Sequence, residues 1–181
     1  MQYAAPDLWL TSKCLDTISR EIQLHLPLRT GGTLLGQGVH TRSKDITHAI
    51  TAGPHAIRTK EAFRADDAYQ AEQINAFLTQ ETSDTQYIGD WFYDPDATYF
   101  SHSTYLKSMK ERAHSGSEPF VCNKPVLLLV TYKDDQLKFY GFQYSHSEAI
   151  APSPAPGWPF ETHFDAYDSM NYHEVRIYGR R

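Results

Sequence analysis

The 181-residue sequence lacks any apolar run of the ~20 residues that a membrane-spanning helix needs, so no membrane span is expected. It has only two cysteines, Cys14 and Cys122, and no C-x-x-C pair, which excludes a structural zinc knuckle. The two cysteines could form one disulfide, but a reduced pair in a cytoplasmic protein is favoured. The first residues also lack the basic and apolar regions of a signal peptide, which again favours the cytoplasm.

A concentrated run of basic residues is also missing. The formal net charge at pH 7 is -5, with 17 Lys and Arg against 22 Asp and Glu. Binding to phosphate groups needs a concentrated basic surface, so this balance argues against a nucleic-acid partner. Apolar residues make up 40% of the chain and charged residues 22%, which is typical of a folded domain.

Three segments have the periodicity of helices. Residues 11–27 begin with Thr and Ser, which are common N-caps, and place Cys14 and other apolar residues on one face. Residues 66–80 carry a stripe of Ala, Ile and Leu behind two Asp residues, which favour a helix N-terminus. Residues 103–113 form the third segment, and Gly116 follows as a stop signal.

The remaining β-prone segments predict a sheet. The run at 125–132 is continuously apolar, as expected for a strand buried on both faces, and 137–144 pairs with it as a hairpin. The other predicted strands are 31–39, 46–53 and 85–93. This order predicts an α/β or α+β fold with a central mixed sheet flanked by helices. Residues 1–149 are interpreted as the domain, and the Pro-rich residues 150–181 as an extension packed against it.

Read in order, several pieces resemble the bacterial form of the JAB/MPN domain, also called the JAMM metalloprotease family. That family runs Glu-x-Gly-Gly-x-Leu-x-Gly, a strand ending in Gly-Pro, a helix, Gly-x-Trp-His-x-His-Pro, and a loop with Ser-x-x-Asp before another helix. The matching pieces are "RTGGTLLGQ", "ITAGPHAIRTKEAFRADDAYQAEQINAF", "YIGDWFYDP", and "STYLKSMKERA" followed by "KPVLLLVTY". The resemblance covers roughly residues 10–145 and implies a cytidine-deaminase-like mixed sheet flanked by helices.

The chemical residues of the family motif are all replaced. In the family, two His and one Asp bind zinc, an upstream Glu takes a proton from the bound water, and a Ser helps to hold the oxyanion. The corresponding positions here are Arg29 for the Glu, Phe92 and Asp94 for the two His, His102 for the Ser, and Tyr105 for the Asp. Phe has no ligand atom and Arg cannot act as a base, so the resemblance implies a catalytically inactive protein without a cofactor.

An enzyme remains the alternative interpretation. Asp94 and His102, with Asp96 or Tyr105, could hold a zinc ion in a metal-dependent isopeptidase or peptidase. Asp90 shares the strand face of Asp94, although Asp residues next to a Pro are also common in turns.

Two further interpretations concern binding. Trp91, Tyr99 and Phe100 are candidate binding residues within an aromatic cluster, with core packing as the default for Trp91 and as the alternative for the other two. By resemblance, the partner would be a ubiquitin-like protein, a conjugation enzyme or a second copy of the chain. Arg29 is predicted to form an ion pair with Asp94 where family enzymes hold their metal, the alternative being an exposed residue after a helix.

Overall fold

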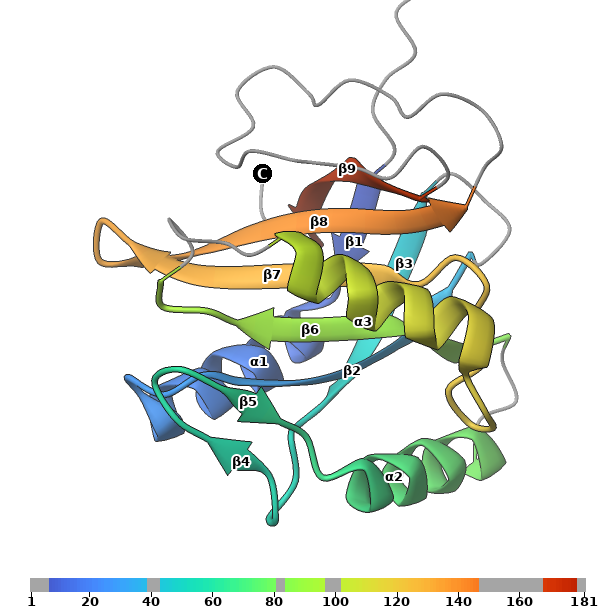
Figure 1. Cartoon of the computed structure of the whole chain (residues 1–181), viewed down its shortest axis with the longest axis horizontal. Coiled ribbons are helices and arrows are strands. Elements are labelled where there is room, and N and C mark those ends of the chain that lie inside the picture. The colour runs from blue at the N-terminus through green and yellow to red at the C-terminus, as the bar shows by residue number, and fades with distance from the viewer. Residues whose placement is uncertain (1–6, 39–42, 81–83, 97–101, 147–167, 179–181) are drawn as a thin grey trace, which may run out of the picture.

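The computed structural model describes residues 7–38, 43–80, 84–96, 102–146 and 168–178 (Figure 1). The helices are α1 (Ser12–His25), α2 (Asp67–Gln80) and α3 (His102–Ser115). The strands are β1 (Asp7–Leu10), β2 (Thr30–Gln37), β3 (Lys44–Ile50), β4 (Ile57–Arg58), β5 (Phe63–Arg64), β6 (Gln86–Tyr93), β7 (Val126–Lys133), β8 (Gln136–His146) and β9 (Asp168–Ile177). The three predicted helices and the mixed α+β architecture are therefore confirmed.

Seven strands form one mixed sheet that closes into a barrel in the order β1-β3-β2-β6-β7-β8-β9. Strand β2 runs antiparallel to both β3 and β6, whereas β6 and β7 are parallel and α3 lies in the connection between them. Strands β7 and β8 form the predicted hairpin. The short strands β4 and β5 make a separate hairpin beside β2 (Figure 1).

The apolar run in β7 is buried on both faces, as its composition predicted. Val126, Leu128 and Val130 pack with residues of α1 in the main core. The intervening Leu127 and Leu129 pack beneath α3. A third cluster lies beneath α2. Because side chains alternate along a strand, one apolar strand joins two layers of the molecule.

The Gly-Gly pair of β2 allows the side chain of Trp91 to pack directly against the backbone of this strand. Trp91 is fully buried, and its indole N–H donates to the carbonyl oxygen of Ile50 at 3.1 Å. A Cβ atom on Gly32 would lie 1.8 Å from that same oxygen and 2.7 Å from the indole nitrogen. Glycine is therefore needed for this close approach. The burial of Trp91 agrees with core packing, the default expectation for this residue.

The sequence predicted no strand in the C-terminal segment, yet β9 completes the barrel between β1 and β8. Its pairing with β1 is parallel, and an ion pair joins Arg176 to Asp7 at 3.2 Å. Tyr178, just beyond β9, donates a hydrogen bond to Asp45 at 2.6 Å and packs against Trp9. Within the described residues, none of the helices is both long and apolar enough to cross a membrane.

Candidate functional site

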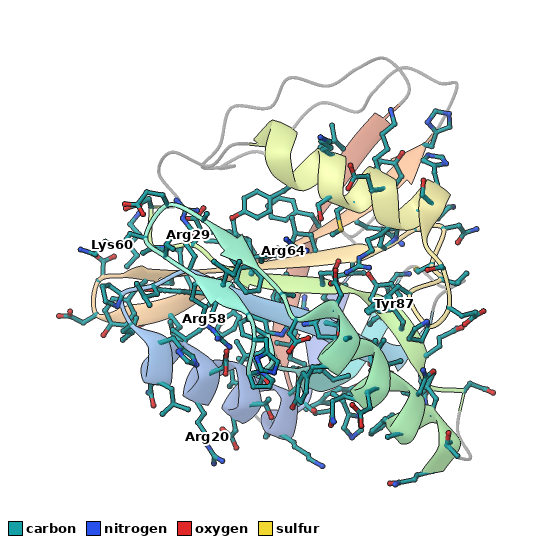
Figure 2. The ribbon with its side chains drawn as sticks, turned by 60° about the horizontal axis from the view of Figure 1, so that its bottom comes forward. Arg20, Arg29, Arg58, Lys60, Arg64 and Tyr87 are labelled. Atoms are coloured by element: carbon teal, nitrogen blue, oxygen red, sulfur yellow. The ribbon has the colours of Figure 1, made fainter. Side chains whose placement is uncertain are left out.

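The site predicted from the family motif lies where β2 begins and β6 ends. Thr30 pairs with Tyr93 and Gly31 pairs with Phe92, so the residues just outside these strands become neighbours. Arg29 precedes β2 and Asp94 follows β6, while α3 passes over the end of β6. Figure 2 shows Arg29 beside Lys60, which belongs to the turn of the β4–β5 hairpin.

The predicted ion pair between Arg29 and Asp94 is confirmed. The distance from Arg29 Nη1 to Asp94 Oδ2 is 2.7 Å, and the Asp94 side chain is only 3% exposed. The second terminal nitrogen of Arg29 lies 3.7 Å from the exposed carboxylate of Asp96. Arg29 Nε donates to the carbonyl oxygen of Lys60 at 2.8 Å, and the Arg29 backbone N–H donates to Thr59. The guanidinium is thus fixed on several sides, and the alternative of an exposed residue after a helix is wrong.

Both oxygens of Asp94 accept hydrogen bonds from the protein. Tyr105, from α3, donates its hydroxyl to Oδ2 at 2.9 Å, and the backbone N–H of Asp96 donates to Oδ1 at 2.9 Å. Burial and the neighbouring Asp94 carboxylate raise the pKa of Tyr105 well above its ordinary value. Tyr105 therefore stays protonated at neutral pH and acts as a hydrogen-bond donor to the carboxylate.

Phe92 occupies the space between the β4–β5 hairpin and α3. Its ring centre lies 5.8 Å from that of Phe63 in an edge-on arrangement and 5.3 Å from that of Tyr105. Gly31 lies against both phenylalanines, because a Cβ atom there would be 2.9 Å from Phe63 and 3.1 Å from Phe92. The position of the first family histidine is therefore filled by packed aromatic rings.

These residues do not fit the zinc site of the family. At the two histidine positions only Asp94 offers ligand oxygens, and the Arg29 charge beside it would repel a divalent cation. Over the described part of the chain, no group of three His, Cys, Asp or Glu side chains gathers closely enough to hold a metal. The side chain of His102 lies outside the described residues, as do Tyr99 and Phe100, so the predictions for these three residues stay predictions.

A second buried carboxylate, Asp90, lies four residues before Asp94 on β6. Arg112 of α3 lies 3.3 Å from it through Nε and also stacks over the ring of Phe120. Tyr105 and Arg112 therefore attach α3 to β6 at two points. The sequence alone does not pair Asp90 with Arg112, although a lone charge inside an apolar strand is a signal that a partner is needed.

Asp90 is less well compensated than Asp94. Among the residues that the structure describes, the buried oxygens without a hydrogen bond are Asp90 Oδ1, Thr33 Oγ1 and the hydroxyl of Tyr87. Thr33 is the register partner of Asp90 on β2, so the two side chains lie on one face of the sheet. Burial raises the pKa of the Asp90 carboxyl, and Arg112 together with the nearby Tyr87 hydroxyl opposes this rise only in part.

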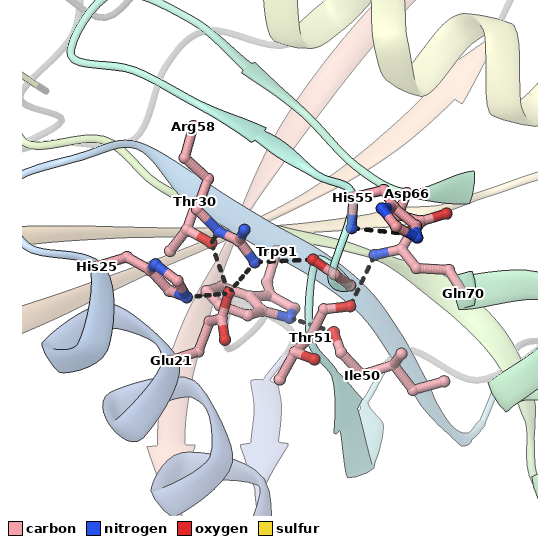
Figure 3. A network of polar contacts seen from close by, with 11 residues as sticks. Glu21, His25, Thr30, Ile50, Thr51, His55, Arg58, Asp66, Gln70 and Trp91 are labelled. Atoms are coloured by element: carbon pink, nitrogen blue, oxygen red, sulfur yellow. Dashed lines mark hydrogen bonds and ion pairs between the residues drawn. The ribbon is translucent and has the colours of Figure 1, made fainter. Parts of the chain in front are cut away.

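A third polar network holds the other side of the β2 start (Figure 3). Glu21 of α1 is buried, lies 2.7 Å from Arg58 of β4, and accepts a hydrogen bond from Thr30 at 2.9 Å. Arg58 also donates to the hydroxyl of Thr30 and to the carbonyl of Gly53. The network fixes α1, β2 and the β4–β5 hairpin relative to one another, next to Arg29. This network was not predicted from the sequence, because its members are far apart in the chain.

Comparison with known proteins gives one relative with an activity in its name. A 90-residue stretch, 50% of this chain, is 28% identical to the "Probable metalloprotease y4qB" of Sinorhizobium fredii. The match spans 55% of that relative, about half its length. This similarity suggests a distant relationship to metalloproteases and agrees with the resemblance found in the motifs. The name fits the metallopeptidase alternative better than an inactive scaffold. No family model matches the chain.

The fold also has a counterpart among solved structures. The solution structure of protein DSY2949 from Desulfitobacterium hafniense is similar with a TM-score of 0.56. The two are 12% identical, and the superposition covers 94% of this chain and 92% of that one. At this identity the likeness concerns the fold alone.

The Arg29–Asp94 pair predicts an asymmetric effect on stability. Replacing Arg29 with Met should lower the free energy of unfolding by about 3 kcal/mol, because buried Asp94 loses its compensating charge. The double variant R29M/D94N should lose less, because no buried charge remains. Urea unfolding at pH 7 measures both, and D96N is the control, since that exposed partner should contribute less than about 1 kcal/mol. A double variant no more stable than R29M would contradict the expectation.

The raised pKa of Asp90 predicts a dependence of stability on pH. Below the unfolded value of 3.8 the carboxyl is protonated in both states, and above it the unfolded state loses its proton first. The contribution of Asp90 therefore becomes less favourable as pH rises from 3.8 through the folded pKa. The variant D90N should gain stability relative to wild type over that interval, as measured by urea unfolding at several pH values. The exposed variant D135N is the control, and a pH-independent D90N difference would refute this expectation.

Proposed function

We propose that this chain is a catalytically inactive JAB/MPN-like domain that serves as a scaffold or protein-binding module. The observation that carries the proposal is the Arg29–Asp94 ion pair, closed by the Tyr105 hydroxyl. These three residues stand at the positions where the family motif has its general base and two of its metal ligands. Their mutual contacts support the alignment of this chain with the motif.

The chemistry of these residues opposes hydrolysis. A metallopeptidase of this family needs an open metal position and a base that takes a proton from the bound water. Arg29 holds its protons at any physiological pH, and Tyr105 is a hydrogen-bond donor with a raised pKa. Phe92 offers no ligand atom and is packed between two other rings. No step of the family reaction can therefore be assigned to these side chains.

The cluster supports a retained structural role instead. Arg29 supplies a fixed positive charge beside a buried carboxylate, which is what a bound cation would otherwise do. The surrounding elements therefore keep their arrangement with the catalytic residues replaced. By resemblance, the partner proposed is a protein, either a ubiquitin-like protein or an enzyme of a bacterial conjugation system, with a second copy of the chain as the alternative.

The alternative function is a metal-dependent isopeptidase or peptidase that uses Asp94 and His102. The name of the Sinorhizobium fredii relative favours it. It would require a metal to displace Arg29 and Tyr105 from the Asp94 carboxylate. The two functions differ in metal content and in cleavage, and both can be measured.

The inactive-domain proposal predicts that the protein does not cut a ubiquitin-like protein fused through its C-terminus, even with excess Zn²⁺. Cleavage is followed by gel and mass spectrometry, and metal content by elemental analysis before and after replacing Asp94 with Ala. Cleavage by the wild-type protein that is lost in D94A, together with a bound zinc lost in the same variant, would establish the peptidase alternative.

Restoring the motif should restore the metal. The variant R29E/F92H/D94H/Y105D places the family residue at the base position and at the three ligand positions, so it should bind one zinc ion at this site with two His and one Asp. The partial variant R29E/Y105D is the control, because it lacks both imidazoles and should bind far more weakly. Circular dichroism verifies folding, and dialysis against Zn²⁺ measures binding. A folded fourfold variant that binds zinc no better than the control would refute the alignment.

A further inference from the structure

Two histidines meet at the end of α3, away from the Arg29 cluster. His114 lies in the last turn of α3, and His146 is the last residue of β8. Their ring centres are 5.4 Å apart, with the ring planes at 88°. Both side chains are exposed and therefore accessible from the solvent.

A buried tyrosine fixes one of these rings. His114 Nε2 lies 3.0 Å from the hydroxyl of Tyr144, a fully buried residue of β8. In the tautomer that carries its proton on Nε2, His114 donates to this hydroxyl and presents the lone pair of Nδ1. Histidines that bind metals commonly make such a hydrogen bond through the second ring nitrogen, which fixes the tautomer and the ring orientation.

The separation of the rings suits a shared metal ion. Zinc–nitrogen bonds are about 2.0–2.1 Å long, so two imidazoles bound to one tetrahedral zinc have ring centres about 5 Å apart. The observed separation of 5.4 Å is close to this value. Imidazole is a ligand that suits Zn²⁺, Ni²⁺ and Cu²⁺, whereas Mg²⁺ and Ca²⁺ prefer oxygen.

We infer that His114 and His146 form a surface binding site for a divalent transition metal ion, with Tyr144 as a positioning residue. Water completes the coordination of the ion. The site is separate from the altered family motif, because His114 lies nine residues beyond Tyr105 on α3, about 13 Å along the helix axis. The inference does not depend on the proposed function, since neither histidine belongs to the Arg29–Asp94 cluster.

The test uses the 181-residue protein without a histidine tag, titrated with Zn²⁺ by calorimetry and with Cu²⁺ monitored by electron paramagnetic resonance. One ion per chain should bind, and the copper spectrum should contain two imidazole nitrogens. H114A and H146A should each weaken binding about tenfold or more, whereas H55A, which removes an exposed histidine elsewhere, should have no effect. Thermal unfolding without metal verifies that each variant is folded.

Two results would overturn the inference. One is wild-type binding that is unchanged in the folded H114A/H146A variant. The other is the absence of any stoichiometric Zn²⁺ or Cu²⁺ binding by the wild-type protein. Loss of metal in D94A but not in H114A/H146A would refute this site and support the peptidase alternative, so the outcomes for the two sites are distinguishable.

Discussion

A buried carboxylate needs a compensating charge, and in this protein that requirement organises the region around Asp94. An aspartate removed from water is costly unless a cation and hydrogen bonds replace its hydration. Arg29 supplies the charge, while Tyr105 and the backbone of Asp96 supply hydrogen bonds. Because Arg29 also binds the carbonyl of Lys60, the start of β2, the end of β6, α3 and the β4–β5 hairpin all meet at one carboxylate.

Strand β6 carries a second buried carboxylate, Asp90, whose charge is less completely compensated than that of Asp94. Asp90 faces α3 and has one cationic partner, Arg112, but one of its oxygens has no hydrogen bond among the described residues. Helix α3 is therefore attached to β6 at two carboxylates. The charge and hydrogen-bonding needs of Asp94 are met in full, whereas those of Asp90 are met only in part. Between these two contacts lie Phe92 and the apolar face of α3, so apolar packing and polar attachment act on the same helix.

Periodicity and the motif predicted much of this arrangement, and the rest depends on long-range contacts. The three helices follow from local patterns, and the Arg29–Asp94 pair follows from placing the chain on the family frame. The sequence of β9 lacks a strong strand pattern. This strand is held in the sheet by its pairing with β1 and β8, which the sequence does not reveal. The pairing of Glu21 with Arg58 could not be inferred either, because only the folded chain brings α1 next to β4.

The parallel pairing of β1 with β9 has a consequence for how the protein is made. Asp7 is aligned with Glu174, so this edge of β1 is covered by a strand that lies far along the sequence and is made much later. During translation the β1 edge stays unpaired while the intervening strands and helices form. Contacts between segments so distant in sequence are slow to form. An open strand edge invites pairing with another chain. The β1 edge is therefore open to misassembly until β9 has been made and has paired with it.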